Sequence, residues 1–250
     1  MIRTVFVVLC LGLATLFVLP FLILWSWLTH DPNFMYFLSM RAVGGCFHFA
    51  GVRARVEGLE NIPAGASVLA ANHLSNLDPL LLLPPIPRRV SVLAKQELFR
   101  IPIFSTGIRL VGYVPVNRSD REAAAASLER AAAVLRAGLP ILVFAEGTRS
   151  PDGHMRPFKR GAFVLAMDAG VPIVPVSISG TQDLLRKGDW VLRPGEVVIR
   201  FGQPVDPSPY SPDRRAELMA RVEALVAAAL PESQQPLAPR MPAPPAASSS

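Results

Sequence analysis

Short segments rich in β-branched and other apolar residues alternate with helical segments along most of this 250-residue chain. Seven segments have strand composition: 52–57, 67–71, 90–94, 112–116, 141–145, 173–178 and 197–201. Helical composition is found at 120–137, 161–169 and 212–229. Ser119 and Gly138 stand at the positions of an N-terminal cap and a C-terminal glycine, and Pro172 and Pro175 suggest that the sixth strand lies at an edge. The alternation predicts an α/β domain with a sheet covered by helices.

The amino end differs from the rest of the chain because it carries no charged residue from Thr4 to Leu28. A straight helix of that length reaches about 37 Å, more than the roughly 30 Å hydrocarbon core of a bilayer, so we expect it to be embedded in a membrane. A cleaved signal peptide is the competing interpretation. Its apolar region is normally about 7 to 15 residues long, and no small-x-small site follows Trp27. Pro20 leaves two arrangements open, a helix that spans the bilayer and a broken one within a single leaflet.

Composition divides the chain into three parts. Residues 33–50 form a second apolar stretch with Arg41 as its one charge, so residues 1–50 are predicted to be a membrane anchor with an interfacial helix. Residues 51–230 are predicted to be one globular domain. Residues 231–250 are mainly Pro, Ala, Ser and Gln, which predicts a disordered tail. Both cysteines lie in the first part, which argues against a cysteine metal cluster or a disulfide framework.

The formal net charge is +6, and between Arg88 and Arg160 there are 13 Lys and Arg residues against 6 Asp and Glu. Beside a membrane anchor, such a surface suits anionic lipid headgroups or an anionic substrate, each basic residue contributing about 1 kcal/mol near a charged leaflet. Nucleic acid is the competing partner of a basic protein, but no nucleic-acid-binding motif supports it. We therefore expect membrane lipid and no nucleic acid as partner. The four histidines are scattered without metal-binding spacing, so no metal is expected.

Residues 72–78 read Asn-His-Leu-Ser-Asn-Leu-Asp and place an imidazole five positions before a carboxylate. This is not helical spacing, since five residues at about 100° each put the side chains roughly 140° apart. A strand ending near residue 71 and a helix beginning at Asp78, with Asp as its cap, predict a turn that returns Asp78 to the His73 ring. Such a pair fixes the imidazole tautomer and leaves the other nitrogen free to act as a general base. Taken singly, either residue is more often structural.

Residues 144–150 read Phe-Ala-Glu-Gly-Thr-Arg-Ser and follow another predicted strand. The Arg149 guanidinium suits bidentate recognition of a phosphate, Gly147 allows close approach of the backbone, and Thr148 adds a hydroxyl donor. Glu146 would repel a phosphate, so we expect it to hold Arg149 or another cation, or to bond a substrate hydroxyl. An ordinary glycine turn after a strand is the alternative for this segment.

Three further cations, Lys95, Arg118 and Lys159, are candidates for binding the same anion, although each alone is more often a solvated or membrane-facing charge. His73 and Glu146 both follow predicted strands, and open α/β sheets usually bind their ligands at the carboxyl ends of strands. We therefore expect the two motifs to meet in one site.

The combination of His-x4-Asp with Glu-Gly-Thr-Arg-Ser resembles the glycerolipid acyltransferase family. The resemblance continues in the segments 95–98, 116–118, 158–161 and 171–176, which are similar to further family blocks. It extends over roughly residues 68–176 in the expected order. Asn117 and Ala145 depart from the pattern, since many relatives carry an acid and a Pro at these positions, but neither touches the presumed chemistry.

The resemblance implies a glycerol-phosphate acyltransferase-like fold over residues 51–230, with a membrane-embedded helical lead-in. It implies His73 as the general base, Asp78 as the residue that orients it, and Glu146 to Arg149 as the binding segment for a glycerol phosphate acceptor. The implied reaction transfers an acyl group from acyl-CoA or acyl carrier protein to the sn-2 hydroxyl of lysophosphatidic acid and gives phosphatidic acid, with no other cofactor. Because acyl thioesters are cytoplasmic, we expect the catalytic domain on the cytoplasmic side of the cell inner membrane.

Other functions are open at this stage. The acceptor depends on pocket shape, so another lysolipid such as lyso-ornithine lipid is an alternative. A lipid hydrolase or phosphatase is a second alternative, although an esterase normally uses a nucleophile elbow and the chain has no Gly-x-Ser-x-Gly. A non-catalytic protein that binds membranes through its basic face is a third.

Overall fold

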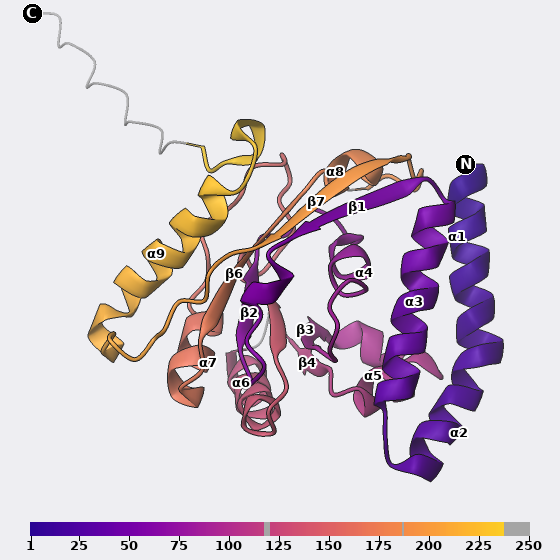
Figure 1. The fold of residues 1–250 in the computed structure, drawn as a ribbon, viewed down its shortest axis with the longest axis horizontal. Helices are drawn as coiled ribbons and strands as arrows, with labels where there is room; N and C mark the ends of the chain where they lie inside the picture. Colours follow the sequence, from indigo (N-terminus) through magenta and orange to yellow (C-terminus); the bar gives the residue numbers. More distant parts are fainter. Residues whose placement is uncertain (118–120, 187, 238–250) are drawn as a thin grey trace, which may run out of the picture.

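A seven-stranded sheet with the strand order β1-β7-β6-β2-β5-β3-β4 forms the centre of the molecule (Figure 1). The structure is a computed structural model that describes residues 1–117, 121–186 and 188–237. The strands are β1 (Val52–Glu57), β2 (Val68–Ala71), β3 (Ser91–Lys95), β4 (Val114–Val116), β5 (Ile141–Phe144), β6 (Ile173–Ser179) and β7 (Gly195–Phe201). Each corresponds to a predicted segment. The central strands β2, β5 and β6 are mainly apolar and buried along their whole length, as suits strands that are covered on both faces.

Parallel pairing brings the functional loops to one edge of the sheet. Strand β2 is parallel to both of its neighbours, with Val68 opposite Ile141 of β5 and Ile173 of β6. Strand β3 is parallel to β5 and to β4. The carboxyl ends of β2, β5, β3 and β4 therefore lie at the same edge, and so do the loops that follow them.

Strand β6 lies in the interior of the sheet, which corrects the expectation that Pro172 and Pro175 mark an edge strand. It pairs parallel with β2 and antiparallel with β7. Regular pairing with β7 is interrupted between Phe201 and Val205, and Pro175 faces this interruption, accepting a hydrogen bond from the Gly202 N–H at 2.8 Å. A residue without an N–H is tolerated at such an irregularity.

Helices cover both faces of the sheet (Figure 1). They are α1 (Ile2–Leu13), α2 (Leu19–Thr29), α3 (Asn33–Phe49), α4 (Asp78–Leu82), α5 (Phe104–Leu110), α6 (Arg121–Arg136), α7 (Gly161–Ala169), α8 (Thr181–Leu184) and α9 (Arg215–Ala228). Leu135 of α6, Phe163 of α7 and Val222 of α9 belong to one buried apolar cluster, while Phe47 of α3 and Leu82 of α4 belong to another. Helices α6, α7 and α9 match the three predicted helices, although the predicted cap Ser119 lies outside the described residues.

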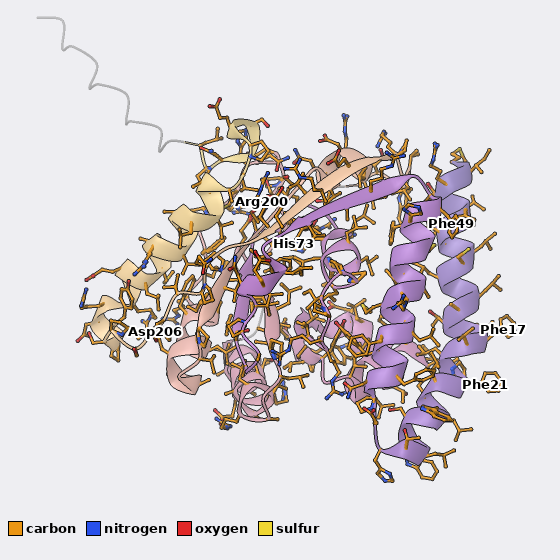
Figure 2. All side chains as sticks on the ribbon, viewed as in Figure 1. Phe17, Phe21, Phe49, His73, Arg200 and Asp206 are labelled. Atoms are coloured by element: carbon orange, nitrogen blue, oxygen red, sulfur yellow. The ribbon has the colours of Figure 1, made fainter. Side chains whose placement is uncertain are left out.

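The apolar amino end is a continuous helix from Ile2 to Thr29, in which a π-helical turn at Ala14–Val18 joins α1 to α2. By length and composition it is the one helix in the described part of the chain that could cross a membrane. Pro20 does not break it, because the π-helical turn just before it relaxes the backbone where the proline ring would otherwise clash. Phe17 and Phe21 are exposed and point away from the rest of the molecule (Figure 2).

Residues 231–235 belong to the folded domain, which corrects the prediction of a disordered tail that starts at residue 231. Gln234 is buried, and its carbonyl accepts a hydrogen bond from the Met155 N–H at 2.8 Å. The rest of the predicted tail, from residue 238, lies outside the described residues.

Candidate active site

The turn between β2 and α4 brings Asp78 back to His73, as the spacing predicts. The Asp78 Oδ2 atom lies 2.7 Å from His73 Nδ1. One detail differs from the prediction, because Leu77 occupies the N-cap and Asp78 is the first residue of α4. The Asp78 carboxylate accepts hydrogen bonds from backbone N–H groups within the turn, so it holds the turn together from inside.

The Asp78 carboxylate is fully buried and has four hydrogen-bond donors. Oδ2 accepts from the His73 ring and from the backbone N–H groups of Leu74 at 2.7 Å and Ser75 at 2.9 Å. Oδ1 accepts from the Thr181 hydroxyl at 2.6 Å. An ionised carboxylate is an acceptor only, so the proton of a neutral His73 belongs on Nδ1 and Nε2 is the free lone pair.

The His73 ring is fixed against the neighbouring strand. It stacks on Phe144, the last residue of β5, with ring centroids 4.1 Å apart and an interplanar angle of 21°. The His73 side chain is 14% exposed, and its Nε2 atom forms no hydrogen bond with a described residue. The ring therefore has a set orientation and one nitrogen available to a substrate.

Glu146 forms no ion pair with Arg149 or with another cation among the described residues, and its expected bond to a substrate hydroxyl stays a prediction. Its side chain is buried, Oε1 accepts from the His73 backbone N–H at 2.7 Å, and Oε2 accepts from the Arg156 backbone N–H at 3.2 Å. Burial raises the pKa of Glu146 to about 7, against the opposing effect of these two N–H donors. Glu146 thus connects the 144–150 motif to the backbone of the 72–78 motif.

Backbone hydrogen bonds also join the two motifs. The Ala145 N–H donates to the Ala71 carbonyl at 2.8 Å, and the Ser150 N–H donates to the His73 carbonyl at 2.8 Å. The segment between them turns at Gly147, whose φ of +74° favours glycine. The loop after β5 is therefore held directly against the loop after β2.

The cations that the sequence predicts to bind an anion differ in their position and in their exposure. Lys159 lies against Gly147, since a Cβ built on this glycine would be 3.0 Å from Lys159 Nζ. Arg149 is partly exposed and forms no ion pair with a described residue, and Thr148 is exposed. Lys95, at the end of β3, is exposed and pairs with Glu97 at 3.1 Å. Arg118 lies outside the described residues.

Two buried polar residues contribute to the site although sequence reasoning did not single them out as functional. Thr181, the first residue of α8, donates its hydroxyl to Asp78, and Asn72 exchanges two hydrogen bonds with the Ile178 backbone at 2.9 and 2.8 Å. Asn72 stands beside His73 in the motif, but no local pattern connects Thr181 to a residue 103 positions earlier. The available signal was its position at a strand end.

The arrangement combines a proton acceptor with neighbouring positive charge. His73 offers a basic nitrogen, and Arg149 and Lys159 lie on the adjoining loops. In the described part of the chain, no three His, Cys, Asp or Glu side chains are grouped so that they could hold a metal ion.

Comparison with known proteins agrees with this fold and shows the family of the chain. The sequence matches the acyltransferase family over residues 53–179, and the chain belongs to this family. It is 33% identical to 1-acyl-sn-glycerol-3-phosphate acyltransferase of Pseudomonas aeruginosa over 184 residues, which is 73% of this chain and 71% of that protein. Its structure is similar to the crystal structure of the 1-acyl-sn-glycerophosphate (LPA) acyltransferase PlsC from Thermotoga maritima, with a TM-score of 0.76 and 32% identity over 90% of this chain and 92% of that one.

Plant relatives are longer than the matched region. The 1-acyl-sn-glycerol-3-phosphate acyltransferase of Cocos nucifera is 31% identical over 172 residues, 68% of this chain but 56% of the coconut protein. The chloroplastic BAT2 enzyme of Brassica napus is 34% identical, and 44% of its length is covered. The chain thus spans about half the length of these two relatives.

Proposed function

We propose that this protein transfers an acyl group from a thioester to the sn-2 hydroxyl of 1-acyl-glycerol-3-phosphate and so forms phosphatidic acid. The observation that carries this proposal is the buried Asp78 carboxylate, which orients His73 and leaves its Nε2 free beside a cationic loop. The names of the relatives supply the reaction and the substrate.

In the proposed mechanism His73 Nε2 accepts the proton of the acceptor hydroxyl while the hydroxyl oxygen attacks the thioester carbonyl carbon. Asp78 stabilises the imidazolium that forms. The tetrahedral intermediate then collapses, the carbon–sulfur bond breaks, and the proton returns from His73 to the leaving thiolate. The new oxygen–carbon bond is the ester, and the free thiol of the carrier is the second product. No acyl-enzyme forms, and the co-substrate is acyl-CoA or acyl carrier protein without another cofactor.

Arg149 and Lys159 are proposed to bind the phosphate of the acceptor, with Thr148 as a neutral donor. An ammonium packed against Gly147 and a guanidinium two residues after it suit a dianionic headgroup. Lys95 and Arg118 stay predicted ligands on adjacent strand ends, and substrate contact by Glu146 and Gly147 also stays a prediction. If the acceptor is another lysolipid, such as lyso-ornithine lipid, His73 is still the base, but the loop after β5 does not bind a glycerol phosphate.

We propose that the amino-terminal helix lies along the cytoplasmic leaflet of the inner membrane. Near its start, the Thr4 hydroxyl accepts a hydrogen bond from the Leu192 N–H at 2.9 Å, and farther along Leu19 packs against Gly107 of α5. A helix in contact with the globular domain over most of its length cannot cross the bilayer unless that domain enters the bilayer too. The exposed apolar side chains on its other side suit insertion into one leaflet.

A direct test follows labelled acyl transfer by the purified full chain in detergent, from acyl-CoA and from acyl carrier protein, onto a panel of lysolipids. We expect phosphatidic acid from the wild type and a loss of at least a thousandfold in turnover for His73→Ala, because the base is removed. His48→Ala, at an exposed position of α3, is the matched control and should keep wild-type activity. Turnover retained in His73→Ala would contradict the mechanism, and release of free fatty acid or phosphate in place of an acylated lipid would indicate a hydrolase.

A further inference from the structure

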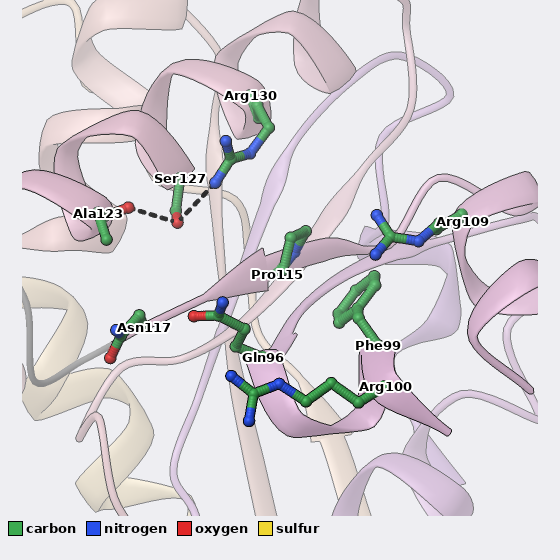
Figure 3. Close-up of a pocket in the computed structure, with 9 residues that line it drawn as sticks. All are labelled: Gln96, Phe99, Arg100, Arg109, Pro115, Asn117, Ala123, Ser127 and Arg130. Carbon is green, nitrogen blue, oxygen red and sulfur yellow. Dashed lines mark hydrogen bonds between the residues drawn. The ribbon is translucent and has the colours of Figure 1, made fainter. Parts of the chain in front are cut away.

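A cationic pocket whose lining does not include His73 lies at the carboxyl ends of β3 and β4 (Figure 3). It is lined by residues of the short helical segment Gln96–Arg100, of α5, of β4 and of α6. Its volume is about 190 Å³. Sites that enclose whole drug-sized ligands have about 300 to 1,000 Å³, so this pocket suits one charged part of a larger molecule.

Three arginines from three elements line this pocket: Arg100, Arg109 of α5 and Arg130 of α6 (Figure 3). None of them forms an ion pair with a described residue. The ion pairs of the neighbouring acids are with other cations, since Glu97 pairs with Lys95 at 3.1 Å and Glu129 pairs with Arg136 at 3.7 Å. Hydrogen bonds from its own backbone and from Lys95 lower the pKa of Glu97, and the Arg100 charge also helps to lower it. No described residue that lines the pocket is a carboxylate, so the lining itself is positively charged.

Two of the three guanidinium groups are held in place by the protein. Arg109 Cζ lies 5.0 Å from the centroid of the buried Phe99 ring. Arg130 Nη2 donates to the Ser127 hydroxyl at 3.2 Å, and this buried hydroxyl donates to the Ala123 carbonyl at 2.8 Å. Arginines held in this way lose less conformational entropy when an anion binds.

The pocket shares a sheet edge with His73. Going from β2 to β4 takes three strand steps through β5 and β3, which is about 14 Å at about 4.8 Å per step. An extended pantetheine arm, which separates the thioester of coenzyme A from its diphosphate, covers this distance. The arm of an acyl donor with its thioester at His73 is therefore long enough for its phosphates to reach the far side of this sheet edge, where the three arginines lie.

We propose that this pocket binds phosphate, and that its ligand is the phosphate part of the acyl donor's pantetheine carrier. The assignment of this phosphate to the acyl donor rests on the proposed function, whereas phosphate binding by the pocket does not. Guanidinium groups pair bidentately with phosphate, and three of them match an anion with more than one negative charge. The other source of the same chemistry is a phospholipid headgroup, because α5, which supplies Arg109, packs against α2 at Gly107 and Leu19.

The test measures binding of unacylated coenzyme A to the full chain in detergent by isothermal titration calorimetry, which does not depend on turnover. Arg100→Gln and Arg130→Gln should each weaken coenzyme A binding about tenfold, since each removes charged hydrogen bonds to phosphate. Arg136→Gln is the matched control, because it removes the same charge from the same helix as Arg130 but lies outside the pocket, and it should stay within twofold of wild type. Thermal melting of each variant checks that the fold is intact.

A second arm measures cosedimentation with vesicles of phosphatidylglycerol or of phosphatidylcholine. The two pocket variants could instead keep coenzyme A binding but lose phosphatidylglycerol binding at least tenfold more than Arg136→Gln does. In that case the pocket binds the phosphate of a phospholipid headgroup, and the assignment to the acyl donor is wrong. If the pocket variants match the control in both arms, or if wild type binds neither probe, the proposal is overturned. Failure of the proposed acyl transfer would show separately, as a wild type that binds coenzyme A but forms no acylated lipid.

Discussion

Four donors converge on the Asp78 carboxylate, and each fixes one part of the candidate site. Two backbone N–H groups shape the turn, the His73 ring receives its orientation, and Thr181 ties the turn to the end of β6. The first three donors lie within the 72–78 motif. Thr181 is the one that only the folded chain supplies, and we infer that it is a positioning residue.

Thr181→Val should lower kcat about tenfold with little change in KM. The substitution keeps the volume but leaves Asp78 Oδ1 without its 2.6 Å donor, and loss of one partner of a buried charged group costs about 1 to 3 kcal/mol. The pH profile of kcat should also shift, because the charge that stabilises the imidazolium is perturbed. Steady-state kinetics between pH 5 and pH 9 measure both effects.

Thr181→Ser is the matched control, since it keeps the hydroxyl and should recover most of the activity. Equal loss in the Val and Ser variants would show that Thr181 acts through packing and not through its hydrogen bond.

At the scale of elements, the helix from Ile2 to Thr29 has two different sides. Val7 and Leu22 are buried against the domain, whereas Phe17 and Phe21 are among the exposed apolar residues. Few soluble proteins leave such an extended apolar surface in water, so this side is expected to contact lipid.

Phe21→Asp should weaken binding to phosphatidylglycerol vesicles tenfold or more. Phe21 is 73% exposed, and an aspartate in the apolar region of a bilayer costs about 2.5 to 3.5 kcal/mol. Vesicle cosedimentation measures the change. Leu225→Asp introduces the same charge on α9, on the other face of the sheet, at a residue that is 44% exposed, and should bind vesicles like wild type. Equal effects of the two variants would place the lipid contact elsewhere.

At the scale of the whole molecule, burial of Glu146 ties the stability of the fold to pH. Its pKa rises from the ordinary 4.5 to about 7, so the folded state holds this proton more tightly than the unfolded state does. The stabilisation that this tighter proton binding gives to the folded state is fully present below about pH 4.5 and is lost as pH rises through about 7. The free energy of unfolding should therefore fall between these values by up to about 3 kcal/mol.

Glu146→Gln should flatten this dependence, because glutamine does not titrate in this range. Melting temperatures in detergent at pH 5, 6, 7 and 8 measure the slope. Glu223→Gln, which replaces another carboxylate that accepts a backbone N–H, should keep the wild-type slope. If wild type and Glu146→Gln lose stability equally as pH rises, Glu146 does not have a raised pKa.

Local sequence determined the elements and the most local part of the site. Seven strand segments, the helices over 161–169 and 212–229, and the pairing of His73 with Asp78 follow from periodicity, turn residues and short spacing, which are properties of neighbouring residues. The resemblance to a family was also carried by short motifs within roughly residues 68–176.

Tertiary structure decided every contact between residues far apart in the chain. It placed β6 inside the sheet, directed the Glu146 carboxylate to the His73 backbone, brought Thr181 to Asp78, and gathered three arginines around one pocket. The physical reason is that strand order and the packing of loops depend on which apolar faces are buried together. No spacing along the chain records that choice, so these contacts are fixed only when the whole sheet assembles.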